Sequence, residues 1–212
     1  MRKVKAILFD MDGVLIEAKE WHYEALNKAL ELFGMTISRY DHLVTYDGLP
    51  TVQKLEMLSI EKGLPVELHE FINELKQQYT MEMVYTRCKP RFFHEYALAR
   101  LKQKGYKLTV CSNSVRKTVE LMMEKSCLIK HLDFYLSNQD VTYPKPDPEI
   151  YTAAIGRLGL QPEECLVIED NEKGIKAGLA SGAHVMAVET VHDVNYQNIM
   201  GNISRINRGD TI

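Results

Sequence analysis

A short apolar run near the start of the chain ends abruptly on two acidic residues. Val4 to Phe9 is followed by Asp10-Met11-Asp12-Gly13. An apolar run of this length that stops at Asp and Gly predicts a strand that is buried on both faces, as in a parallel sheet. Parallel α/β sheets bind their ligands at the carboxyl ends of the strands, so we expect Asp10 and Asp12 at a functional edge.

The spacing of the two acids predicts a cation beside them. Carboxylates held this close repel each other and raise each other's pKa unless a positive charge compensates them. A hard site that is rich in oxygen atoms favours Mg²⁺. A loop with two solvated acids is the alternative interpretation, because this short pattern alone is a weak signal.

Composition excludes several classes of protein. The 212 residues suffice for one large domain or for one domain with an insert, and the formal net charge of −3 gives no electrostatic case for a nucleic-acid or membrane partner. The first apolar run is broken too soon for a signal peptide. The four cysteines form no CxxC pair, and Cys111 and Cys165 lie in apolar runs, so we expect reduced thiols and a cytoplasmic protein.

The rest of the chain divides by pattern into a helical block and a region of alternating strands and helices. The helical block covers about 17–86 and contains no convincing strand. From Arg91 on, strands are expected at 106–111, 132–136, 165–168 and 183–188, with helices between them. The tail after Asp193 is expected to pack as a short helix. This order predicts an α/β fold: a Rossmann-like three-layer core with a mostly parallel sheet (1–16 and 87–212), and an all-helical insert (17–86) after the first strand.

Polar residues follow three of the predicted strands where each strand ends. They are Asp10 and Asp12, Ser112 and Asn113, and Glu169 and Asp170. Lys145 lies between two prolines in Tyr143-Pro144-Lys145-Pro146-Asp147-Pro148, and a rigid loop of this kind is suited to hold an ammonium against an anion. Acids, a hydroxyl, a lysine and a metal-binding acidic pair together suit a phosphoryl group as ligand.

These motifs closely resemble those of the haloacid dehalogenase superfamily, in the branch with a helical cap after the first motif. Four segments match the family pattern in order, and the resemblance covers nearly the whole chain. They are Asp10-Met11-Asp12-Gly13-Val14, then Ser112, then Lys145-Pro146-Asp147-Pro148, then Glu169-Asp170-Asn171-Glu172-Lys173-Gly174-Ile175.

The resemblance implies a mechanism and a role for each residue. Asp10 would be the nucleophile that accepts the phosphoryl group, and Asp12 the general acid and base. Asp10, the backbone carbonyl of Asp12, and Asp170 would bind Mg²⁺, with Glu169 either a ligand or a support. Lys145, Ser112 and backbone N–H groups near Asn113 would hold the phosphate.

Several residues also have simpler interpretations. Ser112 would serve only as a helix cap, Lys145 as a surface lysine and Glu169 as a support for other ligands. His22 matches a position that often faces the active site in sugar-phosphate members, and hinge packing is its alternative. Ala18 replaces a hydroxyl residue that many relatives carry, which puts sugar contacts there in doubt.

The sequence favours simple hydrolysis over two rival functions. A β-phosphoglucomutase-like hexose-phosphate mutase needs a second phosphate clamp, and Gly48-Leu49-Pro50-Thr51 offers no basic residue at the matching place. A non-enzymatic phospho-acceptor signalling module would lack both Asp12 and the helical insert. We therefore expect a Mg²⁺-dependent phosphatase that acts on a small phosphorylated metabolite through an aspartyl-phosphate.

Overall fold

The chain folds into two compact units. The computed structural model describes residues 3–209. One unit combines the N-terminal segment up to Glu17 with the chain from Lys89 onward, and Ala18–Cys88 form the other.

The larger unit is built on one parallel sheet of five strands. Its strand order is β3-β2-β1-β4-β5, so β1 lies at the centre. The strands are β1 (Ala6–Phe9), β2 (Lys107–Cys111), β3 (Phe134–Leu136), β4 (Cys165–Glu169) and β5 (His184–Ala187). In the register, Phe9 is paired with Val110 on one side and with Ile168 on the other. The three central strands therefore end level with one another, and the residues that follow them share one edge.

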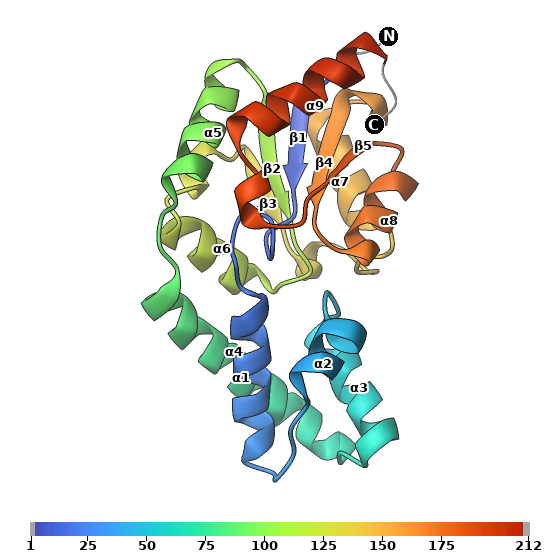
Figure 1. Ribbon diagram of the computed structural model, residues 1–212. Helices are drawn as coiled ribbons and strands as arrows, with labels where there is room; N and C mark the ends of the chain where they lie inside the picture. The colour runs from blue at the N-terminus through green and yellow to red at the C-terminus, as the bar shows by residue number, and fades with distance from the viewer. Residues whose placement is uncertain (1–2, 210–212) are drawn as a thin grey trace. The chain divides into compact units, whose positions relative to one another are not determined.

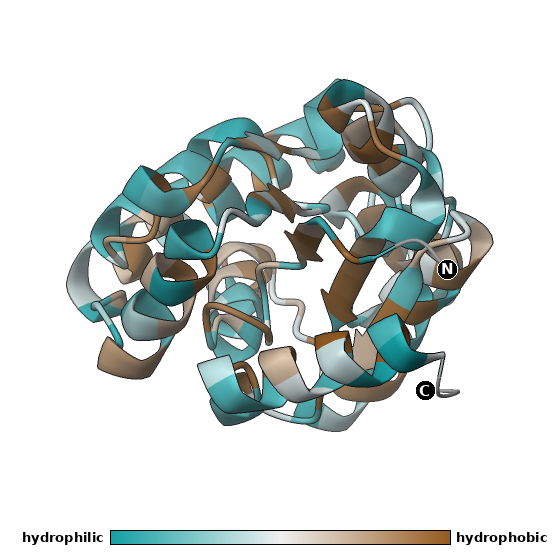
Figure 2. Ribbon diagram, turned by 90° about the horizontal axis from the view of Figure 1, so that it is seen from above, coloured by the Kyte–Doolittle hydropathy of each residue, from teal (hydrophilic) through white to brown (hydrophobic). Residues whose placement is uncertain are grey.

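Helices cover both faces of this sheet and complete three layers. They are α5 (Phe92–Gln103), α6 (Arg116–Lys125), α7 (Glu149–Leu158), α8 (Glu172–Ala180) and α9 (Tyr196–Arg208). Helices α5 and α9 lie side by side on one face (Figure 1). On the other face, Tyr151 and Ala154 of α7 and Ala177 of α8 pack against Leu8 and Val167 of the sheet. Figure 2 shows the apolar strands in brown between helices that carry polar residues in teal.

The predicted fold class is confirmed. The Rossmann-like core has a sheet that is parallel throughout, and the helical segment follows the first strand. Helix α9 differs from the short helix expected at its position, since it is 13 residues long. Its buried residues Ile199, Ile203 and Ile206 do form one apolar stripe, but Gly and Asn residues between them are weak helix formers and hide the pattern.

The smaller unit consists of helices and turns with a core of its own. Its helices are α1 (Lys19–Glu31), α2 (Arg39–Asp41), α3 (Thr51–Lys62) and α4 (His69–Arg87). Helices α1 and α4 pack together, and Leu30, Leu55 and Ile72 are completely or almost completely buried in the common core. The side chain of Asn27 ties α1 to the following loop, because it bonds both the N–H and the carbonyl of Ile37.

The residue types predict Thr51 as the N-cap of one helix and Asp147 as the N-cap of another, with Pro148 in its first turn. Both helix starts are shifted in the structure. Pro50, and not Thr51, is the N-cap of α3, because Pro50 is extended and Thr51 is already helical. Helix α7 starts at Glu149 after Pro148, although Asp147 still accepts a hydrogen bond from the Glu149 N–H (2.9 Å). Asp147 thus satisfies a helix N–H from one residue farther away than predicted. Within residues 3–209, none of the helices combines the length and the apolar character needed to cross a membrane.

Candidate active site

The level ends of β1, β2 and β4 bring distant acidic and polar residues to one edge of the sheet. Asp10 follows β1, Ser112 follows β2, and Glu169 is the last residue of β4. The pattern of sheet bonds continues beyond the first two strands, since the Asp10 N–H donates to the Ile168 carbonyl and the Ser112 N–H to the Leu136 carbonyl. The backbone at this edge is therefore held as firmly as the sheet itself.

Lys145 is the centre of the site. Its ammonium donates three hydrogen bonds, to Asp10 Oδ1 (2.6 Å), to Glu169 Oε1 (2.7 Å) and to the Cys111 carbonyl (2.8 Å). The side chain is almost completely buried. An ammonium has only three protons, so all of its donors are used within the protein. Lys145 thus connects the ends of β1, β2 and β4.

Asn113 holds the loop that carries Lys145. Its side chain accepts from the Lys145 N–H (3.1 Å) and donates to the Lys145 carbonyl (3.3 Å). The amide side chain therefore mimics a backbone strand partner and sets the position of the lysine. The sequence predicted phosphate contacts at or near Asn113, and the structure shows that its side chain fixes the backbone of Lys145.

Glu169 accepts a hydrogen bond at every lone pair of its carboxylate. Oε1 accepts from Lys145 and from the Tyr151 hydroxyl (2.7 Å), and Oε2 accepts from the Asp170 N–H (3.1 Å) and from Asn171 Nδ2 (3.2 Å). Gly174 of α8 makes room for this group, because a Cβ at that position would lie 1.9 Å from Oε1. The glycine in the fourth motif is therefore required by the carboxylate that α8 approaches.

Asp12 lies in a different set of contacts from the other acids. Its Oδ2 accepts from the Ser114 hydroxyl (3.0 Å), and the Ser114 N–H donates to the Ser112 hydroxyl (3.1 Å). Ser112 is not the cap of α6, because this helix begins at Arg116 after Val115. The loop after β2 thus orients Asp12 through Ser114.

The electrostatics of the site show an excess of negative charge. Burial and the nearby carboxylate of Glu169 raise the pKa of Asp10 well above its ordinary value, and Lys145 only partly opposes this shift. Burial lowers the pKa of Lys145, but the carboxylates of Asp10 and Glu169 outweigh it and the net shift is upward. Lys145 therefore stays charged, and one ammonium faces the four acids that the site contains.

The same acids could hold a metal ion. Asp10, Glu169 and Asp170 each offer a carboxylate oxygen, and these atoms lie within 4.8 Å of one another. Oxygen ligands with this charge fit a hard divalent cation, which would compensate the repulsion that raises the pKa of Asp10. The Asp12 carboxylate is not part of this group, consistent with the expectation that only its backbone carbonyl would contribute.

Three contributors were not identified from the sequence. The sequence patterns give no individual role to Tyr151, Ser114 or Asn171. Asn171 does cap α8, since its Oδ1 accepts from the Gly174 N–H (3.0 Å). The one available signal was the second serine of Ser112-Asn113-Ser114, whereas nothing in the sequence pairs Tyr151 with Glu169.

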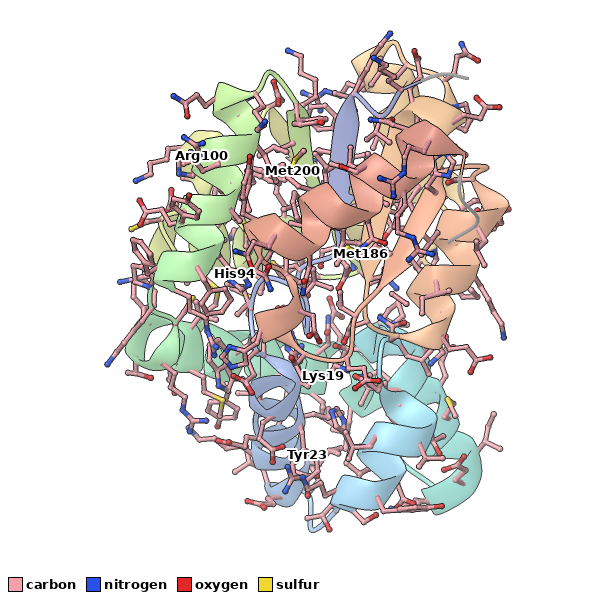
Figure 3. All side chains as sticks on the ribbon, turned by 45° about the horizontal axis from the view of Figure 1, so that its top comes forward. Lys19, Tyr23, His94, Arg100, Met186 and Met200 are labelled. Carbon is pink, nitrogen blue, oxygen red and sulfur yellow. The ribbon has the colours of Figure 1, made fainter. Side chains whose placement is uncertain are left out.

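Two histidines make contacts within their own units. His22, in the helical unit, contacts Lys76, with 3.3 Å between Nδ1 and the ammonium nitrogen. His94, labelled on α5 in Figure 3, is buried and donates from Nε2 to the Val191 carbonyl (2.9 Å). His94 is therefore a packing residue of the larger unit.

Comparison with known proteins agrees with the fold and the motifs. The sequence-family model of the haloacid dehalogenase-like hydrolases matches residues 7–188. The pyrophosphatase PpaX of Bacillus velezensis is 28% identical over 196 residues, which cover 88% of this chain and 84% of the relative. A phosphoglycolate phosphatase of Aquifex aeolicus is 30% identical over 181 residues, which cover 84% of this chain and 82% of the relative.

A solved structure supports the same fold. The crystal structure of a β-phosphoglucomutase from Clostridium difficile matches with a TM-score of 0.83 over 97% of this chain and 99% of that one, at 19% identity. The chain belongs to the haloacid dehalogenase-like hydrolase family. The resemblance inferred from the motifs is thereby confirmed, as is the expectation of an enzyme of this class.

Proposed function

We propose that the chain is a Mg²⁺-dependent phosphomonoester hydrolase that acts on a small phosphorylated metabolite such as a sugar phosphate. In this proposal 1–16 and 87–212 form the catalytic core and 17–86 the cap domain. The observation that carries it is Lys145, whose ammonium bridges Asp10 and Glu169, two of the three carboxylates that could hold a metal ion. Relatives named pyrophosphatase, phosphorylated carbohydrates phosphatase and phosphoglycolate phosphatase support it.

The proposed reaction has two steps that share one nucleophile. Asp10 attacks phosphorus, the ester P–O bond breaks, and Asp12 gives its proton to the departing alkoxide. Asp12 then takes a proton from water, whose oxygen attacks the aspartyl-phosphate, releases inorganic phosphate and restores Asp10. The hydrogen bond from Ser114 holds Asp12 in place for both proton transfers.

The other residues stabilise charge. Mg²⁺, held by Asp10, the Asp12 carbonyl and Asp170 with Glu169 as ligand or support, would supply compensation for the charge on the nucleophile and on the phosphoryl oxygens. Lys145 favours the ionised form of Asp10, partly opposing the effect of burial, and its hydrogen bond points the carboxylate in one direction. Ser112 and backbone N–H groups near Asn113 would bind the phosphoryl oxygens.

The test is phosphate release from a panel of phosphomonoesters in the presence of Mg²⁺. We expect Asp10→Asn to abolish turnover, because an amide cannot attack phosphorus. Asp133→Asn is the matched control, since Asp133 precedes β3 at the opposite ends of the strands and bonds Lys102 and the Leu108 N–H. Phosphate release by Asp10→Asn at the rate of the control would exclude this mechanism.

The same panel separates the rival functions. A hexose-phosphate mutase would be stimulated by a sugar bisphosphate and would release little phosphate. A phospho-acceptor signalling module would accumulate a long-lived phosphoprotein with negligible turnover, which intact-protein mass spectrometry detects. We expect neither result.

A further inference from the structure

Tyr151 contacts both partners of the central ion pair from the helix behind them. Its hydroxyl donates to Glu169 Oε1 at 2.7 Å, and the Lys145 ammonium lies 4.7 Å from the centre of its ring. The side chain is completely buried, at 0% exposure. Its ring packs in the core between α7 and the sheet, where a phenylalanine would fill the same space. Packing alone therefore does not require the hydroxyl group.

The hydroxyl completes a network in which every donor of Lys145 and every lone pair of the Glu169 carboxylate is used. Lys145 directs its three protons to Asp10, Glu169 and the Cys111 carbonyl. Glu169 accepts four hydrogen bonds, and Tyr151 provides one of the two on Oε1. Hydrogen bonds to a charged group are stronger than those between neutral groups, so removing the Tyr151 donor changes how strongly Glu169 attracts the Lys145 ammonium.

We propose that Tyr151 is a positioning residue of this site: it holds Glu169 and Lys145 so that the ammonium stays directed at Asp10. The proposal rests on the function proposed above. It also decides whether Glu169 is a metal ligand or a support for the metal site, which that function left open. With all four lone pairs of Glu169 occupied by protein donors, Glu169 supports the metal site and is not itself a ligand. Asp10 and Asp170 then provide the carboxylate ligands.

The test is Tyr151→Phe, which removes the hydroxyl and keeps the ring. Without this donor, Glu169 carries more charge on Oε1, attracts Lys145 away from Asp10 and has a lone pair open to a cation. We expect kcat for p-nitrophenyl phosphate to fall about tenfold. We also expect the Kd for Mn²⁺, measured on the enzyme without substrate by electron paramagnetic resonance, to fall about threefold. Tighter metal binding together with slower turnover is a pattern that lost packing does not produce.

Tyr143→Phe is the matched control, because Tyr143 lies in the loop that carries Lys145 and its side chain is 63% exposed. We expect kcat and Mn²⁺ affinity of this variant to equal those of the unmodified enzyme. A second variant, Asn171→Ser, removes the amide donor that Glu169 Oε2 shares with Asp170 Oδ1 and keeps an oxygen that can cap α8. We expect Asn171→Ser to tighten Mn²⁺ binding as well. This variant serves as the test if the Tyr151→Phe protein does not fold.

Any other combination overturns the proposal. Unchanged kcat, unchanged Mn²⁺ affinity, or weaker Mn²⁺ binding with a lower Tm in Tyr151→Phe would show that the hydroxyl serves stability alone. The metal measurement needs no turnover, so it stays informative whatever the outcome of the Asp10→Asn experiment. Failure of the proposed function and failure of this inference are thereby distinguished.

Discussion

The Lys145 ammonium lies 2.6 Å from Asp10 Oδ1, although 135 residues separate the two in the chain. Lys145 is 3% exposed and Asp10 is 6% exposed. Moving either charge out of water alone would cost several kcal/mol, and the pair tolerates burial because each group compensates the other. The contact therefore couples the folding of the loop before α7 to the end of the central strand.

Replacing Lys145 should destabilise the protein and stop the reaction. Lys145→Met keeps the length of the side chain but leaves the carboxylates of Asp10 and Glu169 buried without their cation. Breaking a buried pair on one side costs about 3–5 kcal/mol, and losing one electrostatic contact of this kind costs roughly 10²–10³ in rate. Urea unfolding and phosphate release measure the two effects. The loss of stability should be smaller at pH 5 than at pH 8, because protonated carboxylates are cheaper to bury.

A surface lysine provides the comparison. Lys107 of β2 pairs with Asp133 (3.3 Å), and its side chain is 57% exposed. Exposed pairs contribute about 0–1 kcal/mol, so Lys107→Met should change the free energy of unfolding little at either pH. Equal losses of unfolding free energy in Lys145→Met and Lys107→Met would show that the buried pair contributes no more to stability than the exposed one.

Gly174 is predicted to be required for activity rather than for helix formation. A Cβ on Gly174 would lie 1.9 Å from Glu169 Oε1 and 2.0 Å from Cδ, so the carboxylate must move in Gly174→Ala. Displacing Glu169 disturbs Lys145 and the carboxylate group together, and we expect phosphate release to fall at least tenfold.

Two other helical glycines separate this effect from helix propensity. A Cβ on Gly156 of α7 meets nothing within 4 Å, so Gly156→Ala should stabilise the protein by about 0.5–1 kcal/mol and leave activity unchanged. A Cβ on Gly178 of α8 would lie 2.9 Å from Val185 in the core, so Gly178→Ala should lower stability without changing Mn²⁺ affinity. A fully active Gly174→Ala enzyme would contradict the crowding described here.

The parts of the fold that were predicted from the sequence are those with strong local signals. The apolar runs before Asp10, Ser112 and Glu169 predicted three strands, because strands buried on both faces are apolar throughout. The rule that parallel strands end at one functional edge then placed these residues together. The structure brings them to one edge and adds the distances that sequence patterns do not contain.

Other features depend on contacts between distant segments. Tyr151 lies on the buried face of α7, and its spacing from neighbouring apolar residues is that of any core aromatic, so its bond to Glu169 had no local signal. Ser114 bonds Asp12 across 102 residues of sequence. Helix α9 was underestimated because tertiary packing of its isoleucines outweighs the weak helix propensity of Gly201 and Asn202. Local sequence patterns therefore predict the helices and strands, whereas the hydrogen bonds of the site form only when these elements pack together.

His94 is predicted to make stability depend on pH. Burial lowers its pKa to about 4, against the opposing effect of the bond to the Val191 carbonyl. Below the pKa of about 6.5 in the unfolded chain, the unfolded imidazole binds a proton that the folded one excludes. The free energy of unfolding should therefore fall as the pH drops from 6.5 toward 4 and level off below. At pH 5 the contribution lost is about 2 kcal/mol, since each pH unit corresponds to about 1.4 kcal/mol.

The variant His94→Gln isolates this contribution. Glutamine carries no titrating group near these pH values, and its amide can donate to the Val191 carbonyl as Nε2 does. Urea unfolding at pH 7 and at pH 5 should show a difference between the two pH values that is smaller in the variant by about 2 kcal/mol. Parallel pH profiles for the two proteins would mean that His94 binds its proton equally well in the folded and unfolded states. That result would contradict burial of the ring as a cause of a lowered pKa.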